Sequence, residues 1–442
     1  MRISPFKRCG KEVAAKDVRQ LGLCATITVP EDRSHPQGRT ISLPIIRIPA
    51  LVAARGEPAF VLNGGPGASN MPGGIALRPI HEDRDVYFIG YRGADGSTVL
   101  RCPEVIGALG SQPLGSRSAT TALGQATKAC AARWTANGVN LNKYTIFDVI
   151  DDLEAVSDRL GLRRVSLISV SYGTRVAQYY ARRHPQRIAR SAMFGANPPG
   201  HFVFSAEIND QVIDRLARIC AADPVCSNYS KDLKQTIRLA LTAGTRTGNP
   251  KINDETTRLA MFTMLYSRES TLLFLRAAVA AEMGDTSLLE QAGAYLQAGA
   301  SGLIAGDLLA KGSIDVYRYE QMRPTFALSD SSIGSPWDQF YSAMAAGWPL
   351  PKASPEYLRA AIDPTPTLIV NGDLDVSTPL QFIERELMPF LPNGQLVVLK
   401  DYGHSDFLRQ QAAIGRMTAG FLRNGTVDRS LVAPDPYTFP KP

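Results

Sequence analysis

The residues around one serine suggest that its hydroxyl acts as a nucleophile. Ser171 is the centre of Ser-Val-Ser-Tyr-Gly at residues 169–173, between a short apolar run and a helical pattern. A sharp turn from strand to helix exposes such a serine, and it needs small residues two before and two after, because strand and helix approach closely there. Gly173 meets this need, and Ser169 stands where glycine is more usual. The segment predicts nucleophilic chemistry at Ser171.

A serine hydroxyl needs a base, and histidine is the usual one near neutral pH. The chain has five histidines: His35, His81, His184, His201 and His404. His404 follows the last apolar run of the chain, at residues 396–399. The carboxyl ends of parallel strands share one edge of a sheet, where Ser171 is also expected. Position therefore favours His404 as the base.

Two aspartates are candidates for the acid that orients the histidine and stabilises its charged form. Asp373 and Asp375 both follow the apolar run at residues 367–370. Either could instead cap the helical pattern that comes next. A serine, an acid and a histidine in this chain order are typical of the α/β-hydrolase triad. The sequence thus predicts a triad of Ser171, an aspartate and His404.

Acyl transfer also needs two backbone N–H groups aimed at the charge that develops on the attacked carbonyl oxygen. We expect one from Tyr172, which follows the nucleophile, and one from Gly65 in the Asn-Gly-Gly-Pro-Gly loop at residues 63–67. Glycines let the backbone approach a substrate because no Cβ stands in the way. The loop lacks the lysine of a phosphate-binding loop, which disfavours that alternative.

The elements that must position these residues alternate between strand and helix. Buried strands are predicted from apolar runs at residues 59–62, 86–89, 165–168, 188–194, 367–370 and 396–399. An amphipathic helix is predicted at residues 145–160, where Thr145 can cap the first turn and Gly161 closes the last. This alternation predicts an α/β fold with a mainly parallel sheet and helices on both faces.

A helical segment interrupts the alternation. From about residue 201 to 360 the periodicity is mostly helical, and no clear buried strand appears. We therefore expect an α/β core made of residues 1–200 and 361–442. A helical cap of residues 201–360 would be inserted between the two parts of the core.

The composition excludes several classes of protein. With 44% hydrophobic and 20% charged residues, the chain of 442 residues is an ordinary globular one. Its net charge of +7 is spread out, without the clustered basic and aromatic residues of a nucleic-acid-binding surface. The longest uncharged stretch, residues 58–77, is rich in glycine and proline and predicts a loop, not a membrane span. We expect neither a cofactor nor a metal, and the oligomeric state is not predicted.

The six cysteines fall in pairs that are close in sequence. The pairs are Cys9 and Cys24, Cys102 and Cys130, and Cys220 and Cys226. Sequence alone does not fix their connectivity, so they are either reduced thiols or short-range disulfides, which need an oxidising compartment. The residues after Met1 form no apolar signal core, so an exported protein would be present here in its mature form.

Together these motifs resemble the prolyl aminopeptidase and tripeptidyl aminopeptidase-like branch of the α/β hydrolases. The family's His-Gly-Gly-Pro-Gly loop corresponds to residues 63–67, with Asn63 in place of histidine. Its Asp-x-Arg-Gly-x-Gly-x-Ser loop appears in altered form at residues 90–97. Its acid segment Gly-x-x-Asp-x-x-Thr-Pro matches residues 372–379, and its Gly-His-Ser segment matches residues 403–405.

The resemblance implies roles for individual residues. It selects Asp375 over Asp373 as the acid of the triad. Aminopeptidases of this family bind the free amine of the substrate with acidic residues of the cap. This points to Glu320, with Glu207 and Asp210 as further candidates, and Asn63 is a candidate substrate contact in the glycine loop. Members of the branch are often exported, which favours the disulfides and a periplasmic or secreted location over a cytoplasmic one.

We therefore expect a serine hydrolase that works through an acyl-enzyme, most simply an aminopeptidase that releases N-terminal residues from short peptides. The alternative is a carboxylesterase, lactonase or small-amide hydrolase with the same triad, if the cap has no working amine anchor. A third possibility is a catalytically silent binding protein. The presence of serine, acid and histidine in the right order argues against it.

Overall fold

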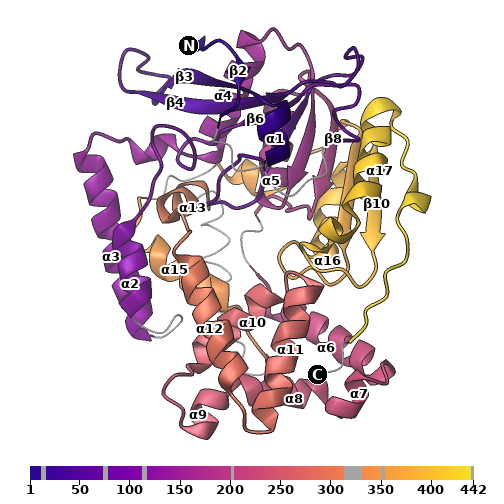
Figure 1. The fold of residues 1–442 in the computed structure, drawn as a ribbon. Helices are drawn as coiled ribbons and strands as arrows, with labels where there is room; N and C mark the ends of the chain where they lie inside the picture. The colour runs from indigo at the N-terminus through magenta and orange to yellow at the C-terminus, as the bar shows by residue number, and fades with distance from the viewer. Residues whose placement is uncertain are drawn as a thin grey trace.

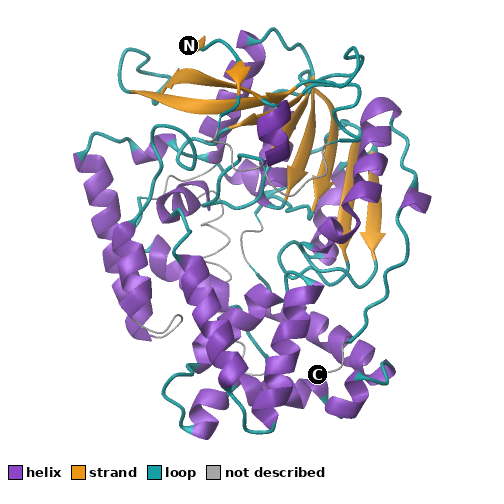
Figure 2. Cartoon of the chain, viewed as in Figure 1, coloured by secondary structure: helices purple, strands orange, loops and turns teal. Residues whose placement is uncertain are grey.

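The computed structural model describes residues 1–10, 16–72, 78–111, 117–200, 204–312, 331–349 and 354–439. A ten-stranded sheet forms one end of the molecule (Figures 1 and 2). Its strands are β1 (Arg2–Ile3), β2 (Lys7–Arg8), β3 (Leu23–Pro30), β4 (Thr40–Ile48), β5 (Ala59–Leu62), β6 (Val86–Ile89), β7 (Val165–Val170), β8 (Ile188–Phe194), β9 (Thr367–Gly372) and β10 (Gly394–Leu399).

The central part of this sheet is parallel. The strand order is β1-β3-β4-β6-β5-β7-β8-β9-β10, and β2 pairs with β3. All pairs from β6 to β10 are parallel, whereas β1 to β4 pair antiparallel. The predicted mainly parallel sheet is therefore confirmed. The carboxyl ends of β5, β7, β8, β9 and β10 lie along one edge, as parallel pairing requires.

Helices cover both faces of the sheet because successive side chains of a buried strand point to opposite sides. In β9, Ile369 packs into one apolar cluster with residues of α4 (Ile146–Arg159) and α5 (Tyr172–Arg183). Its neighbours Leu368 and Val370 pack into a second cluster, with residues of α17 (Gln411–Asn424). Continuously apolar strands are what this arrangement needs.

The helix predicted at residues 145–160 forms as α4. Thr145 accepts from the backbone of Asp148, and the Asp148 side chain accepts from the Thr145 N–H, which satisfies the first turn. The apolar stripe that begins with Ile146 and Val149 is buried against the sheet.

Two further helices beside the core, α2 (Pro103–Ser111) and α3 (Arg117–Ala136), were not predicted from the sequence. They are rich in small residues and lack a continuous apolar stripe, so periodicity does not reveal them. The helical pattern that follows Asp375 forms as three short consecutive segments of different type, α16 (Leu380–Phe382), the π-helical η5 (Ile383–Leu387) and the 3-10-helical η6 (Met388–Phe390). Pro389 contributes to this because it has no N–H to donate.

Helices make up most of the described residues between β8 and β9, and we call this segment the cap. They are α6 (Ala206–Ala222), α7 (Cys226–Tyr229), α8 (Leu233–Leu241), α9 (Ala243–Thr247), α10 (Asp254–Met264), α11 (Arg268–Glu282), α12 (Ser287–Ala300), α13 (Ala305–Gly312) and α15 (Pro336–Ala345). Most of them lie beyond the carboxyl edge of the sheet, around an apolar cluster of their own (Figure 1). Several begin at a polar side chain that accepts an N–H of the first turn, such as Asn253 and Ser267.

All three sequence-local cysteine pairs are joined as disulfides, Cys9–Cys24, Cys102–Cys130 and Cys220–Cys226. The first joins the residue after β2 to β3, the second joins the residue before α2 to α3, and the third joins α6 to α7. Over the described ranges, no helix is both long and apolar enough to cross a bilayer.

Candidate active site

Ser171 lies at the turn from β7 to α5 in a backbone conformation that a residue with a Cβ rarely adopts. Its φ angle is 53°, in the region that favours glycine, and such strain is characteristic of functional turns. The turn is fixed by hydrogen bonds from the Ser171 N–H to the Phe194 carbonyl (2.8 Å) and from the Thr174 hydroxyl to the Ser171 carbonyl (2.6 Å).

The residues on either side of the serine explain the pattern of small side chains. A Cβ at Gly173 would lie 2.1 Å from the carbonyl oxygen of Leu62 in the neighbouring strand, so no larger residue fits there. Ser169 is fully buried, and its hydroxyl donates to the Ala192 carbonyl at 3.3 Å. Serine is therefore accommodated at the position where glycine is more usual, because its hydroxyl finds a partner on β8.

His404 and Asp375 lie together at the ends of β10 and β9. The distance from His404 Nδ1 to Asp375 Oδ2 is 2.8 Å, and both side chains are buried. The other carboxylate oxygen accepts the N–H groups of Ser377 and Thr378, each at 2.8 Å, and the Thr378 hydroxyl donates to Oδ2 at 2.6 Å. This places the carboxylate at one nitrogen of the imidazole and leaves Nε2 for another partner.

Gly195 connects the surroundings of Ser171 to those of His404. It follows Phe194, whose carbonyl accepts the Ser171 N–H, and a Cβ at Gly195 would lie 2.9 Å from His404 Cε1. The turn of Ser171 and the imidazole of His404 therefore both border the end of β8. No hydrogen bond between Ser171 and His404 is formed in this structure, and apo geometries of such pairs are often loose.

The cap contacts the histidine directly. Tyr266, between α10 and α11, packs edge-on against the His404 ring with centroids 5.1 Å apart. Its carbonyl accepts the N–H of Ser405 at 2.7 Å. Burial raises the pKa of Tyr266, so the ring is neutral where it meets the imidazole. Sequence reasoning missed this residue, because a lone tyrosine between two helices carries no signal.

Asp373, the alternative acid, has different partners. It accepts the N–H of Asp401 at 2.6 Å and lies 3.5 Å from the guanidinium of Arg215 on α6. Burial raises the pKa of Asp373. Asp373 therefore holds the loop after β10, through Asp401, and forms an ion pair with the cap, through Arg215.

The remaining histidines have other surroundings. His35 is exposed beside Asp32, His81 is within 3.1 Å of the Pro49 carbonyl, and His184 ends α5 near Glu154. His201 lies outside the described residues.

The glycine loop approaches the serine, as the sequence predicts for an oxyanion loop. A Cβ at Gly64 would lie 3.0 Å from the Ser171 Cβ, while Gly65 is exposed with φ at 129°. The backbone N–H of Asn63 donates to Asn70 at 2.7 Å, and its side-chain amide donates to the Met71 carbonyl at 3.0 Å. Asn63 thus closes the base of the loop.

Tyr172 is buried and begins α5, so its N–H belongs to the first turn of a helix. Such N–H groups have no partner within the helix and carry partial positive charge. They are suited to a developing oxyanion.

The acidic cap residues suggested by the sequence have varied surroundings. Glu207 is exposed in the first turn of α6 and accepts from Gln211 of the same helix. Asp210 accepts the N–H of Ser332 at 2.8 Å. Glu320 lies outside the described residues.

Sequence reasoning missed a buried carboxyl of the cap, Asp338 on α15. It is fully buried, and Oδ2 accepts the N–H of Phe204 at 3.0 Å. Burial raises the pKa of Asp338 well above its ordinary value.

Comparison with known families identifies the chain. Residues 58–214 match the family described as alpha/beta hydrolase fold, and residues 333–433 match the family described as TAP-like protein. The chain is a TAP-like α/β hydrolase. The second match covers the loops of Asp375 and His404, and the first covers the turn of Ser171.

Several characterised proteins are similar to this hydrolase. Serine protease Hip1 of Mycobacterium tuberculosis (strain H37Rv) is 28% identical over 222 residues, which cover 46% of this chain and 42% of Hip1. Carboxylesterase B of Mycobacterium tuberculosis (strain CDC 1551) is 34% identical over 104 residues, which cover 22% of this chain and 20% of the esterase. The matches thus span less than half the length of either relative.

The solved structures that are similar to this chain include proline iminopeptidase from Mycobacterium smegmatis. It is 16% identical to this hydrolase, with a TM-score of 0.42, over 90% of this chain and 98% of that one. The family matches place the chain among serine hydrolases of the α/β type.

Proposed function

We propose that this hydrolase is a serine aminopeptidase that releases N-terminal residues from peptides through an acyl-enzyme. The observation that carries the proposal is the buried pair of His404 and Asp375 beside the strained turn of Ser171. The similarity to serine protease Hip1 supports a peptide substrate.

In the proposed mechanism Ser171 Oγ attacks the carbonyl carbon of the scissile peptide bond. His404 Nε2 takes the hydroxyl proton and then gives it to the leaving amine, while Asp375 stays ionised and holds Nδ1–H. The N–H groups of Gly65 and Tyr172 bind the oxyanion. Water, deprotonated by His404, then attacks the acyl-enzyme and releases the acid, which restores Ser171.

The bonds around Asp375 suit this role. Two backbone N–H groups and the Thr378 hydroxyl hold the carboxylate in one orientation. Hydrogen bonds to the charged form favour an ionised carboxylate. The acid can therefore stabilise the imidazolium that forms during proton transfer.

Recognition of the substrate's amine is assigned to carboxyls of the cap. Glu320 is the candidate from family resemblance, and Asp338 is a second candidate because it is a fully buried carboxyl of the cap. A protonated amine placed beside Asp338 would favour the ionised carboxylate that burial disfavours.

The nucleophile is tested with a fluorophosphonate probe. We expect the wild type to be labelled and the Ser171→Ala variant to be spared. The matched control is Ser169→Ala, a buried serine two residues away, which should keep its labelling. A wild type that the probe does not label, or labelling that survives Ser171→Ala, would refute the proposed chemistry.

The peptidase assignment is tested by blocking the substrate's amine. We expect aminoacyl-nitroanilides to be cleaved, and N-acetylation of the same compounds to reduce kcat/KM by about 10²-fold or more, because a carboxyl built for an ammonium loses its partner. Equal rates for free and acetylated substrates would overturn the aminopeptidase assignment while leaving the triad intact.

The second candidate is a carboxylesterase, favoured by the match of 104 residues to carboxylesterase B. Short acyl esters assayed beside the nitroanilides distinguish the two. Higher kcat/KM for esters, together with no effect of N-acetylation, would establish the esterase.

We also propose that the protein works outside the cytoplasm. Its three disulfides join all six cysteines, and such bonds persist in oxidising compartments. Thiol titration of the denatured protein without reductant should find no free thiol. Six free thiols in protein purified from its native source would contradict this location.

A further inference from the structure

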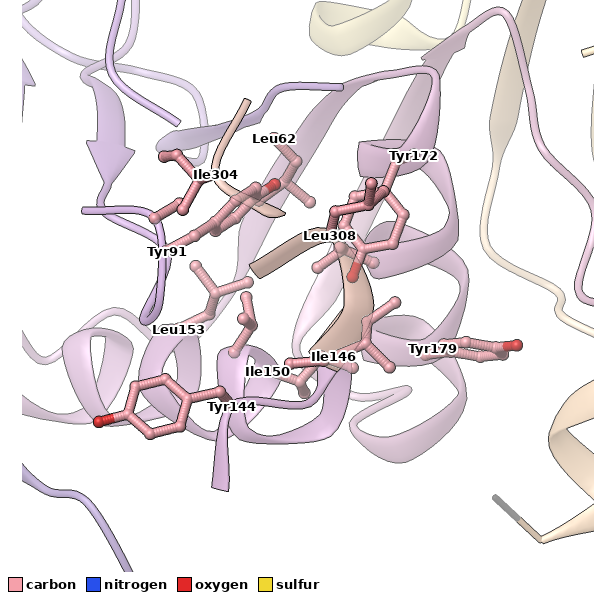
Figure 3. Packing of buried hydrophobic residues seen from close by; sticks show 14 of the residues in the cluster. Leu62, Tyr91, Tyr144, Ile146, Ile150, Leu153, Tyr172, Tyr179, Ile304 and Leu308 are labelled. Carbon is pink, nitrogen blue, oxygen red and sulfur yellow. The ribbon is translucent and has the colours of Figure 1, made fainter. Parts of the chain in front are cut away.

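The tip of the glycine loop is held by the cap and not by the core. The N–H of Gly67 donates to Asp307 Oδ2 at 3.0 Å, and the Gly67 carbonyl accepts the N–H of Ile304 at 3.1 Å. A Cβ at Gly67 would lie 3.0 Å from Leu308 Cβ, so the loop is pressed against α13. Ile304 and Leu308 belong to the same buried cluster as Tyr172 (Figure 3).

Asp307 is fully buried and has partners on two sides. One oxygen accepts from Gly67, and the other accepts from the ammonium of Lys311 one turn later on α13. Lys311 is also fully buried and donates to the Arg92 carbonyl at 2.8 Å. A Cβ at Gly93 would lie 2.6 Å from the Asp307 carboxylate, so this glycine makes room for it.

The loop is therefore fixed at two points. At its base, the Asn63 N–H bonds to Asn70, and Asn70 is itself tied to the carbonyls of Val61 and Ile89 on β5 and β6. At its tip, Asp307 holds Gly67. Between these points lie the glycines beside Ser171, whose peptide orientation determines where their N–H groups are aimed.

We propose that Asp307 is a positioning residue that sets the oxyanion loop from the cap, through its hydrogen bond to Gly67. The inference rests on the proposed role of Gly65 in binding the oxyanion. Asp307 acts through the loop and is not a catalytic residue. Docking of α13 and stabilisation of the transition state are thereby coupled, because the same carboxylate belongs to the cap and orients the loop.

Two double variants distinguish positioning of the glycine loop by Asp307 from a purely structural ion pair between Asp307 and Lys311. Asp307→Asn with Lys311→Met removes both charges but keeps an acceptor for the Gly67 N–H. Asp307→Leu with Lys311→Met removes the charges and the acceptor, and leucine has the same branching as asparagine. Replacing a buried ion pair by uncharged residues is often tolerated, so both variants are expected to fold.

We expect the leucine variant to lose about 10²-fold in kcat, the order of effect of losing one oxyanion donor, with KM changed less than about threefold. Its rate constant for fluorophosphonate labelling should fall by a similar factor. The asparagine variant should retain kcat within about fivefold of the wild type. Equal kcat in the two double variants, or a wild-type kcat in the leucine variant, would overturn the proposal.

The matched control is Asp254→Asn. Asp254 is also a cap aspartate that accepts a glycine N–H, that of Gly244 at 2.9 Å, but on α10 and away from the glycine loop. We expect its substitution to change stability and to leave kcat and the labelling rate within twofold.

Amide hydrogen exchange tests the hydrogen bond from Gly67 to Asp307 in the wild-type protein and needs no activity assay. In the wild type we expect the Gly67 N–H to exchange slowly although Gly65 and Ala68 in the same loop are exposed. Fast exchange at Gly67 would overturn the proposal even if a leucine variant failed to fold. A wild type that is unlabelled by the probe but protected at Gly67 would instead count against the proposed function alone.

Discussion

At the scale of single residues, the site separates two aspartates that the sequence places side by side. Asp375 is hydrogen-bonded to His404, whereas Asp373 accepts the backbone N–H of Asp401 and lies beside the guanidinium of Arg215. Their spacing of two residues is enough to send them to different partners in the loop after β9. Asp338, in contrast, is a fully buried carboxyl that no local sequence pattern predicts.

The burial of Asp338 gives a pH dependence of stability with a defined sign. Its pKa is raised in the folded state, so the fold holds this proton more tightly than the unfolded chain does. Unfolding then releases a proton, and this group's contribution to the free energy of unfolding falls as pH rises above the ordinary aspartate value.

We therefore expect Asp338→Asn to raise Tm relative to the wild type by an amount that grows from pH 4.5 to pH 7. Thermal unfolding of both proteins at several pH values measures it. A constant difference in Tm across this range would contradict the prediction.

At the scale of elements, the nucleophile turn depends on how closely α5 approaches the neighbouring strand β5. The strained φ of Ser171 persists because bonds to Phe194 and from Thr174 hold the turn on both sides. Gly173 then allows the first turn of α5 to approach Leu62.

Substitution of Gly173 by alanine should therefore be strongly destabilising. The added Cβ would meet the Leu62 carbonyl at 2.1 Å, and we expect a loss of about 3 kcal/mol or more in the free energy of unfolding. Denaturant unfolding measures this loss. Gly107→Ala on the exposed side of α2 is the control, since nothing lies within 4 Å of its Cβ, and it should stabilise by about 0.5–1 kcal/mol. Equal effects of the two substitutions would refute the steric argument.

At the scale of the whole molecule, the C-terminal segment ties the cap to the core. The chain leaves α17 and returns to the cap, where Tyr437 and Phe439 join its apolar cluster (Figure 1). Arg268 on α11 is buried between them and the core. It donates to the Asp435 side chain and backbone, and to the Asp401 carbonyl at 3.2 Å.

We expect Arg268→Ala to cost about 3 kcal/mol in the free energy of unfolding, because it removes the hydrogen bonds of a nearly buried guanidinium, one of them to the buried Asp401 carbonyl. Arg409→Ala is a matched control. Arg409 also bonds Asp435, at 2.8 Å, but it is 41% exposed, so its loss should cost less than about 1 kcal/mol. Urea unfolding of both variants measures the difference, and similar costs would show that Arg268 does not tie the cap to the core.

The sequence by itself determined the α/β alternation and the strand-turn-helix at Ser171. These features are local, because strand runs, helix caps and small turn residues are encoded within a few positions of one another. For the cysteines it showed only which ones are close in the chain, and the structure decided that they are joined. Residue order also predicted His404 and an aspartate at position 373 or 375, since parallel strands bring their carboxyl ends to one edge. The family resemblance then selected Asp375. Helices α2 and α3 escaped prediction because small residues give no apolar stripe.

Only the tertiary structure decided what surrounds those candidates. Tyr266 against His404, Asp307 at Gly67 and Arg268 at Asp435 each join residues more than a hundred positions apart. Such contacts depend on how the cap docks on the core, and no local pattern encodes that docking. The candidate residues were therefore predictable from the chain, whereas the contacts that hold them in place required the fold.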